Sequence, residues 1–420
     1  VLNNGLKRGF HAFYNYGGAI PSLPPGTTRF PWPVDRLTSK YMQLLRRLSY
    51  PIQNFFGRSD LAFRVSLNAW LTPLWSRFAN FKGQNERSVR DVTRFLRQRE
   101  QQAARKPLFL FLNLMETHLP FWPPGEFVDR TAPYMRSSQE AREIMRRWNR
   151  EAYRWAAPLE KPLSPLEDRV LHDMYDAEVA YQDSYLGELL QALNGRSRRD
   201  NTLTIIVADH GDGLGEHNYF GHAFVAYQEL VHVPLIVHWP RRLAAHSGRV
   251  SVPVSTRRVF HTMLDAAGML PERPFLDPEE IHSRTLIHTI LGRDPEKGTA
   301  YTEIYPPMNF VRAIESRQPH LLEKFRCLSM RRAVVRTDET GVFKLIEVDD
   351  SPDELFDLVL DPLEQHNELP AYPQLVAKMA TDLERFTAVS RSAQVEKTAV
   401  ADTNIDESLR QRLRGLGYLD

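Results

Sequence analysis

A single cysteine, Cys327, is present among the 420 residues of the sequence. One thiol excludes an intrachain disulfide framework, and it fits a reducing compartment without identifying one. No apolar run approaches the roughly 18 residues that a membrane-spanning helix needs, so no transmembrane segment is expected. The formal net charge of only +2 gives no reason to expect a nucleic-acid partner.

Apolar and charged residues occur in the proportions of an ordinary globular chain. Of all residues, 42% are hydrophobic and 25% are charged, which is enough to bury a large core in one big domain and a smaller one. The chain begins with Val1, so the sequence does not decide whether a signal peptide precedes it. Composition therefore leaves the compartment and the oligomeric state undetermined.

The stretch from residue 201 to residue 240 contains the clearest pattern. Residues 202–208 form a short β-branched apolar run without charge, which predicts a strand buried on both faces. This run ends in Asp209 and His210, and residues 233–237 predict a second buried strand. Polar side chains at the carboxyl end of a buried strand lie where open α/β sheets bind their ligands.

The residue types at this strand end favour a metal site. Asp oxygen and His nitrogen are both metal ligands, and Asp209 and His210 can share one ion if the backbone turns sharply. Gly211, Gly213 and Gly215 would permit such a turn, because glycine tolerates positive φ. A capped turn without a metal is the alternative interpretation of this motif taken alone.

Four submotifs in this stretch resemble the second metal-binding segment of the sulfatase family, within the alkaline-phosphatase-like superfamily. They are Asp209-His210-Gly211, Gly215-Glu216-His217, Gly221-His222 and Val233-Pro234-Leu235-Ile236. Their order and spacing make the resemblance specific. It implies an α/β fold with a central, mostly parallel sheet flanked by helices, and a smaller C-terminal antiparallel sheet with a helix.

Segments before this stretch carry the same resemblance. Residues 107–115 predict a buried strand, and His118-Leu119-Pro120-Phe121 then resembles the family pattern His-x-Pro-aromatic. Residues 166–193 carry an apolar stripe at helical spacing and predict a long helix. The resemblance is weakest at residues 30–80, where a loop-and-helix insertion is expected, and at 125–165, within the polar surface excursion or lid that is expected at residues 123–165.

The C-terminal third resembles the family as well. Residues 332–337 and 343–348 predict a hairpin, and residues 354–369 resemble the C-terminal signature of sulfatases closely. We therefore expect a catalytic α/β domain at residues 1–295, lacking its first strand and nucleophile helix, and a C-terminal α+β subdomain at residues 296–420.

The resemblance implies hydrolysis of small anionic sulfate esters. Sulfatases use a formylglycine nucleophile, a divalent cation that neutralises the sulfuryl group as charge shifts, and an acid that assists the leaving oxygen. Carried onto this sequence, Asp209 and His210 are the metal ligands, and His118 and His222 are the catalytic residues. The implied cation is Ca²⁺, with Mg²⁺ or Mn²⁺ as alternatives.

The sequence lacks the motif that supplies the nucleophile, Cys/Ser-x-Pro/Ala-x-Arg, and the paired early aspartates of the metal site. Cys327 has Arg331 four residues on, but the middle Pro or Ala is absent and the segment runs into the predicted hairpin. We interpret Cys327 as a small buried hydrophobe instead. The formylglycine is then expected in a segment that precedes Val1, and the chain alone is expected to be inactive.

Two other functions stay open from the sequence. His210 stands where many arylsulfatases have Asn, and His222 stands where they often have Lys. Both features keep a phosphodiester or phosphonate monoester hydrolase on the same fold as an alternative. The third possibility is a non-catalytic remnant that binds a partner or an anion.

Overall fold

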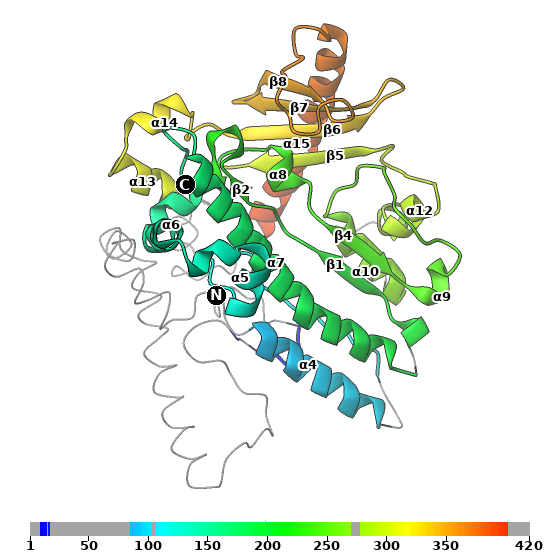
Figure 1. The fold of residues 1–420 in the computed structure, drawn as a ribbon. Helices are drawn as coiled ribbons and strands as arrows, with labels where there is room; N and C mark the ends of the chain where they lie inside the picture. Colours follow the sequence, from blue (N-terminus) through cyan, green and yellow to red (C-terminus); the bar gives the residue numbers. More distant parts are fainter. Residues whose placement is uncertain are drawn as a thin grey trace. The chain divides into compact units, whose positions relative to one another are not determined.

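The structure is a computed structural model that describes residues 9–14, 16, 85–102, 106–197, 199–269 and 278–401 (Figure 1). The chain divides into two compact units. The first comprises Val1–Trp155 and Pro162–Arg199, and the second comprises Ala156–Lys161 and Asp200–Asp420. The sequence-predicted boundary between residues 295 and 296 falls inside the second unit and stays a prediction. The insertion expected at residues 30–80 lies outside the described residues.

The long helix α7, Pro165–Asn194, is the main element of the first unit. The hydroxyl oxygen of Ser164 accepts the amide proton of Glu167 at 3.3 Å and so caps the first turn. Helix α4, Asn85–Glu100, packs against α7. The predicted apolar stripe is confirmed, because its buried members include Val170, Met174, Ala177, Tyr185 and Leu189.

Residues 125–150 form a folded helical layer, so the predicted polar surface excursion is wrong for this part of residues 123–165, and the predicted lid stays a prediction. Helices α5, Gly125–Thr131, and α6, Gln139–Arg150, both pack against α7. The indole of Trp148 is fully buried, and its Nε1 donates to Glu167 at 2.7 Å. The arginines of α6 belong to its more exposed face. Apolar residues recur at helical spacing on its buried face: Ala141, Ile144, Met145 and Trp148.

The apolar run at residues 107–115 forms neither a helix nor a strand, so the prediction of a buried strand there is wrong. The side chains of Leu108, Phe109, Leu110 and Phe111 are exposed, and Phe109 stacks on Phe10 with ring centroids 5.7 Å apart. A strand requires a ladder partner, and no partner strand for this segment is found among the described residues.

In the second unit, both strands predicted around residue 209 are confirmed. Strand β1, Thr204–Val207, pairs antiparallel with β4, Leu235–His238. The pair is half-buried rather than buried on both faces: Val237 packs on a helical cluster that includes Trp239, Leu243 and Ile287, whereas Ile236 is 55% exposed. Pairings within the described residues are antiparallel, and the parallel strands of the expected central sheet are not among them.

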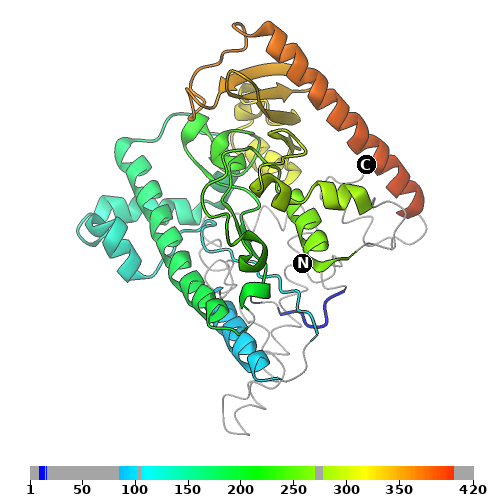
Figure 2. The same ribbon diagram turned by 90° about the vertical axis from the view of Figure 1, so that its right-hand side faces the viewer.

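The predicted C-terminal sheet and helix are confirmed. Strands β5 to β8 form an antiparallel sheet in sequence order; they are Thr299–Ile304, Arg331–Thr337, Val342–Val348 and Ser351–Asp357. Helix α15, Pro373–Ala401, is the long helix beside this sheet in Figure 2. Its residues Met379 and Leu383 pack on Val334, Leu345 and Leu355, so the sheet and helix share one core.

Short helices complete the second unit. They are α8 Gln228–Val231, α9 Pro240–Leu243, α10 Arg258–Ala267, α11 Pro278–Ser283, α12 Leu286–Ile290, α13 Met308–Glu315 and α14 His320–Lys324. Gly268 ends α10 in the left-handed conformation, with φ of 62°. Within the described ranges, every helix is too short or too polar to cross a membrane.

Candidate metal and catalytic site

The chain that follows β1 folds back on itself as a closed loop, residues 209–231, here named the site loop. Strands β2, Gly213–Leu214, and β3, Phe220–Gly221, form a small hairpin inside it. The amide of Gly211 donates to the carbonyl oxygen of Leu230 at 2.8 Å and joins the two ends of the loop. These backbone bonds hold residues 209–212 close to the residues that follow the hairpin.

Glycine serves this loop in two different ways. Gly215 has φ of 125°, a value that other residues rarely adopt, so the predicted turn is confirmed there. Gly211 has no positive φ, but a Cβ at this position would overlap the carbonyl oxygen of Glu229. Gly213 has neither constraint, so the expectation that it supplies a positive φ is wrong.

Three side chains of the site loop lie close together beside the first strand pair of the hairpin, Gly213 with Gly221. They are His210, Asp212 and His222. Each offers a ligand atom within 4.8 Å of the others. Nδ1 of His222 lies 2.8 Å from Oδ1 of Asp212, and the rings of His210 and His222 stack with centroids 4.4 Å apart. A carboxylate beside two imidazoles is a donor set that can bind a divalent cation or an anionic ester.

The side chains of Asp209 and His210, the predicted metal ligands, lie close to each other. Nδ1 of His210 lies 2.9 Å from the carbonyl oxygen of Gly211, so this nitrogen donates a proton and Nε2 keeps its lone pair. Oδ2 of Asp209 lies 3.8 Å from that Nε2, and the Asp209 side chain is 91% exposed. The role of this pair as metal ligands stays a prediction.

Asp212 was not among the sequence-predicted site residues. The hairpin register pairs Gly213 with Gly221, so the residue before one and the residue after the other lie side by side. Asp212 and His222 occupy those positions. In the sequence, Asp212 is visible as the fourth residue of Asp-His-Gly-Asp. Its place beside His222 follows only from the register of the hairpin, which the sequence does not give.

His118 belongs to the first unit, and the other site residues belong to the second. It is half-buried, and its Nδ1 lies 2.6 Å from the carbonyl oxygen of Leu119. That carbonyl accepts a proton from Nδ1. Its catalytic role stays a prediction.

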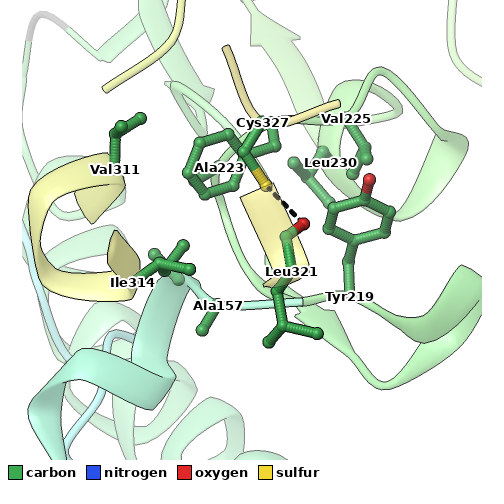
Figure 3. Close-up of a cluster of buried hydrophobic side chains, with 11 residues drawn as sticks. Ala157, Tyr219, Ala223, Val225, Leu230, Val311, Ile314, Leu321 and Cys327 are labelled. Carbon is green, nitrogen blue, oxygen red and sulfur yellow. Dashed lines mark hydrogen bonds between the residues drawn. The ribbon is translucent and has the colours of Figure 1, made fainter. Parts of the chain in front are cut away.

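Cys327 is confirmed as a packing residue. Its side chain is fully buried in an apolar cluster with Ala157, Tyr219 and Leu321, and its Sγ faces the carbonyl oxygen of Leu321 at 3.7 Å (Figure 3). Burial raises the pKa of the thiol to about 11. A buried, protonated thiol is a poor nucleophile, which agrees with its exclusion on sequence grounds.

Residues 8–269 match the family model Sulfatase, and the chain belongs to the sulfatase family. The match spans the site loop, β1 and β4, so the cluster of His210, Asp212 and His222 lies within the family region. Membership implies a divalent metal and a formylglycine nucleophile for the family reaction.

Known sulfatases are similar to parts of the chain. An uncharacterized sulfatase, YidJ, of Escherichia coli K12 is 27% identical over 183 residues, which are 43% of this chain and 35% of that protein. Choline-sulfatase of Rhizobium meliloti is 28% identical over 240 residues, which are 54% of this chain and 40% of that protein. The matched regions thus span less than half the length of these relatives.

A solved structure shows the fold class. Phosphonate monoester hydrolase of Agrobacterium radiobacter aligns with a TM-score of 0.51 and 20% identity over 71% of this chain and 60% of its own. The chain therefore shares the α/β fold of that hydrolase, and its membership of the sulfatase family places it in the alkaline-phosphatase-like superfamily, as predicted.

Proposed function

We propose that this protein takes part in metal-dependent hydrolysis of sulfate esters. The observation that carries the proposal is the arrangement at the end of β1, where Asp209, His210, Asp212 and His222 gather on one loop. Family membership supports sulfate esters as the substrate class.

In this proposal, Asp209 and His210 hold the divalent cation. The cation supplies charge neutralisation for the anionic ester when bound. The resemblance implies Ca²⁺, but Ca²⁺ prefers oxygen ligands. The imidazole nitrogen of His210 departs from an all-oxygen ligand set, and Mg²⁺ and Mn²⁺ are the alternatives.

His222 has the geometry of an oriented acid or oxygen contact. Its Nδ1 donates to Asp212, so the ring is held with Nε2 directed away from that carboxylate. His118 is proposed as the second catalytic residue on the basis of its family pattern. The proposal assigns no nucleophile, because the sequence contains no Cys/Ser-x-Pro/Ala-x-Arg motif.

One comparison of substrates and variants tests the proposal. When a segment that carries the formylglycine nucleophile is supplied, the metal-loaded protein should release sulfate from an aryl sulfate faster than phosphate from the matching aryl phosphate or phosphonate ester. The double variant Asp209→Ala, His210→Ala should lose both bound metal and turnover, whereas Asp183→Ala, an exposed aspartate on α7, should lose neither.

Two outcomes would decide against sulfate esters. Faster hydrolysis of the phosphonate ester would favour the phosphonate monoester hydrolase, an alternative that the imidazole of His210 supports. Bound metal without turnover of any ester would favour a remnant that only binds anions.

A further inference from the structure

The site loop is joined to the C-terminal sheet subdomain by a buried polar cluster around His217. Its ring lies flat on Tyr227, with centroids 3.8 Å apart and planes 13° apart. Nδ1 lies 2.9 Å from Oε1 of Glu229, within the site loop, and Nε2 lies 3.0 Å from the backbone oxygen of Glu364. The side chains of His217 and Glu229 are only 13% and 14% exposed.

Both ring nitrogens of His217 thus face oxygen acceptors. A carboxylate and a carbonyl cannot donate, so both contacts are hydrogen bonds only when the imidazole carries two protons. The amide nitrogen of Gln365 donates to the carbonyl of Leu363 at 2.8 Å and also lies 3.5 Å from Nε2, which is farther from Nε2 than the carbonyl oxygen of Glu364 at 3.0 Å. The cationic form satisfies the close contacts best.

The charges around the ring also favour the cationic form of His217. Lys344 and Glu364 are both fully buried, with Nζ and Oε1 2.7 Å apart, so they neutralise each other. Glu229 and Glu354 remain as negative groups near the ring, and the latter accepts a proton from the Tyr227 hydroxyl at 2.9 Å. A neutral His217 would leave this half-buried region with excess negative charge.

Glu364 holds the site loop at a second point. Its Oε2 accepts the amide proton of Gln228 at 2.7 Å, so one residue of the C-terminal signature contacts the loop through both its backbone and its side chain. His217 lies in the turn of the hairpin, and Asp212 and His222 lie at the hairpin's other end. The contacts of His217 and Gln228 with Glu364 therefore hold two points of the loop that carries the site residues.

We propose that His217 is a protonated latch that ties the site loop to the turn at Glu364, so that loss of one ring proton loosens the loop carrying Asp212 and His222. His217 is a positioning residue in this scheme. Its consequence for turnover rests on the proposed function, but the latch itself does not.

The direction of the pH effect follows from the contacts. Burial alone would lower the pKa of His217, but the hydrogen bond and charge of Glu229 and the carbonyl of Glu364 raise it above its ordinary value. Stabilisation from such a group is complete below the unfolded-state pKa and is lost as pH rises through the folded-state pKa. The loop should therefore loosen on the alkaline side.

Two measurements on the full chain test the latch without any substrate. Nitrogen NMR of the ring should show a midpoint for His217 above that of the exposed His246. Amide hydrogen exchange, expressed as protection relative to intrinsic rates, should show protection of residues 211–231 falling about tenfold through the same midpoint. Strands β6 and β7 should keep their protection across that range.

Variants separate the latch from a structural histidine. Glu229→Gln keeps an acceptor but removes the charge, so both midpoints should fall by about one pH unit. His217→Gln should abolish the pH step in loop protection, and His246→Gln should retain it. Protection of β6 and β7 reports whether each variant is folded.

Three results would overturn the proposal: a His217 midpoint at or below that of His246, no pH step in the wild-type loop, or an unchanged step in folded His217→Gln. None of these involves turnover, so failure of the latch and failure of sulfate-ester hydrolysis are distinguishable.

Discussion

Gly211 donates its amide proton to the carbonyl oxygen of Leu230 at 2.8 Å, and this bond closes the site loop. The approach is so close that a Cβ at Gly211 would overlap the neighbouring carbonyl of Glu229. Backbone atoms cannot rotate aside as a side chain can, so the contact places a strict limit on this position.

Gly211→Ala is expected to lower the free energy of unfolding by about 1–3 kcal/mol, because the loop ends must move apart. Gly213→Ala is the matched control, since its Cβ would meet only ordinary van der Waals contacts. Urea unfolding of both variants measures the difference. Equal stabilities would show that the loop ends separate at little cost.

In an enzyme completed with the nucleophile segment, His222→Ala should reduce turnover of esters with poor leaving groups by roughly a hundredfold, because the leaving oxygen then lacks its proton donor. Activated aryl esters should lose much less, since their leaving group needs little protonation. Steady-state kinetics on both ester types provide the comparison, with His246→Ala as the control. Equal losses would make His222 an electrostatic contact, and no loss would make its role structural.

Cys327→Ser should lower the free energy of unfolding by about 1 kcal/mol and leave metal binding intact. The thiol is fully buried, so the hydroxyl would enter an apolar cluster. In the native wild-type protein the thiol should resist alkylation, because burial raises its pKa to about 11. Rapid native-state labelling would contradict this placement.

Asp294 should contribute to acid sensitivity of the second unit. Burial alone would raise the pKa of its carboxyl, but hydrogen bonds from Gly298, Thr289 and Arg258 lower it below its ordinary value. A group with a depressed folded-state pKa stabilises the fold above its unfolded-state pKa, and that contribution is lost as pH falls through the folded-state pKa.

Asp294→Asn should therefore cost about 3 kcal/mol at pH 7, since it removes the nearer of the two carboxylates beside the fully buried Arg258. Below pH 4 the gap between variant and wild type should narrow. Urea midpoints at pH 7 and pH 3 measure both effects, and Asp183→Asn is the exposed control. A gap that stays constant with pH would show that Asp294 does not titrate with unfolding.

Local patterns predicted the elements whose partners are near in sequence. The apolar stripe of α7 and the hairpin of β6 and β7 are confirmed because a helix face and a two-strand register are set by neighbouring residues. The run at residues 107–115 has the composition of a strand, but composition does not supply a ladder partner, and its side chains at 108–111 are exposed.

The candidate site was predicted in part for the same reason. Asp209 and His210 follow directly from the end of β1, whereas the pairing of Asp212 with His222 depends on a hairpin register. The contact of His217 with Glu364 joins residues 147 positions apart. Such a contact arises from tertiary packing, so the spacing of residues in a single sequence does not predict it.

The six residues Ala156–Lys161 belong to the second unit, although the chain on both sides of them belongs to the first. Leu159 donates to the carbonyl of Asn218 at 2.7 Å, and Ala156 and Ala157 pack in the cluster that contains Cys327. During synthesis from the N-terminus, this cluster cannot close until Cys327 has left the ribosome. The second unit must therefore bind a segment made long before its own strands, and a gene fragment that starts at residue 200 would lack Ala156 and Ala157 from this cluster.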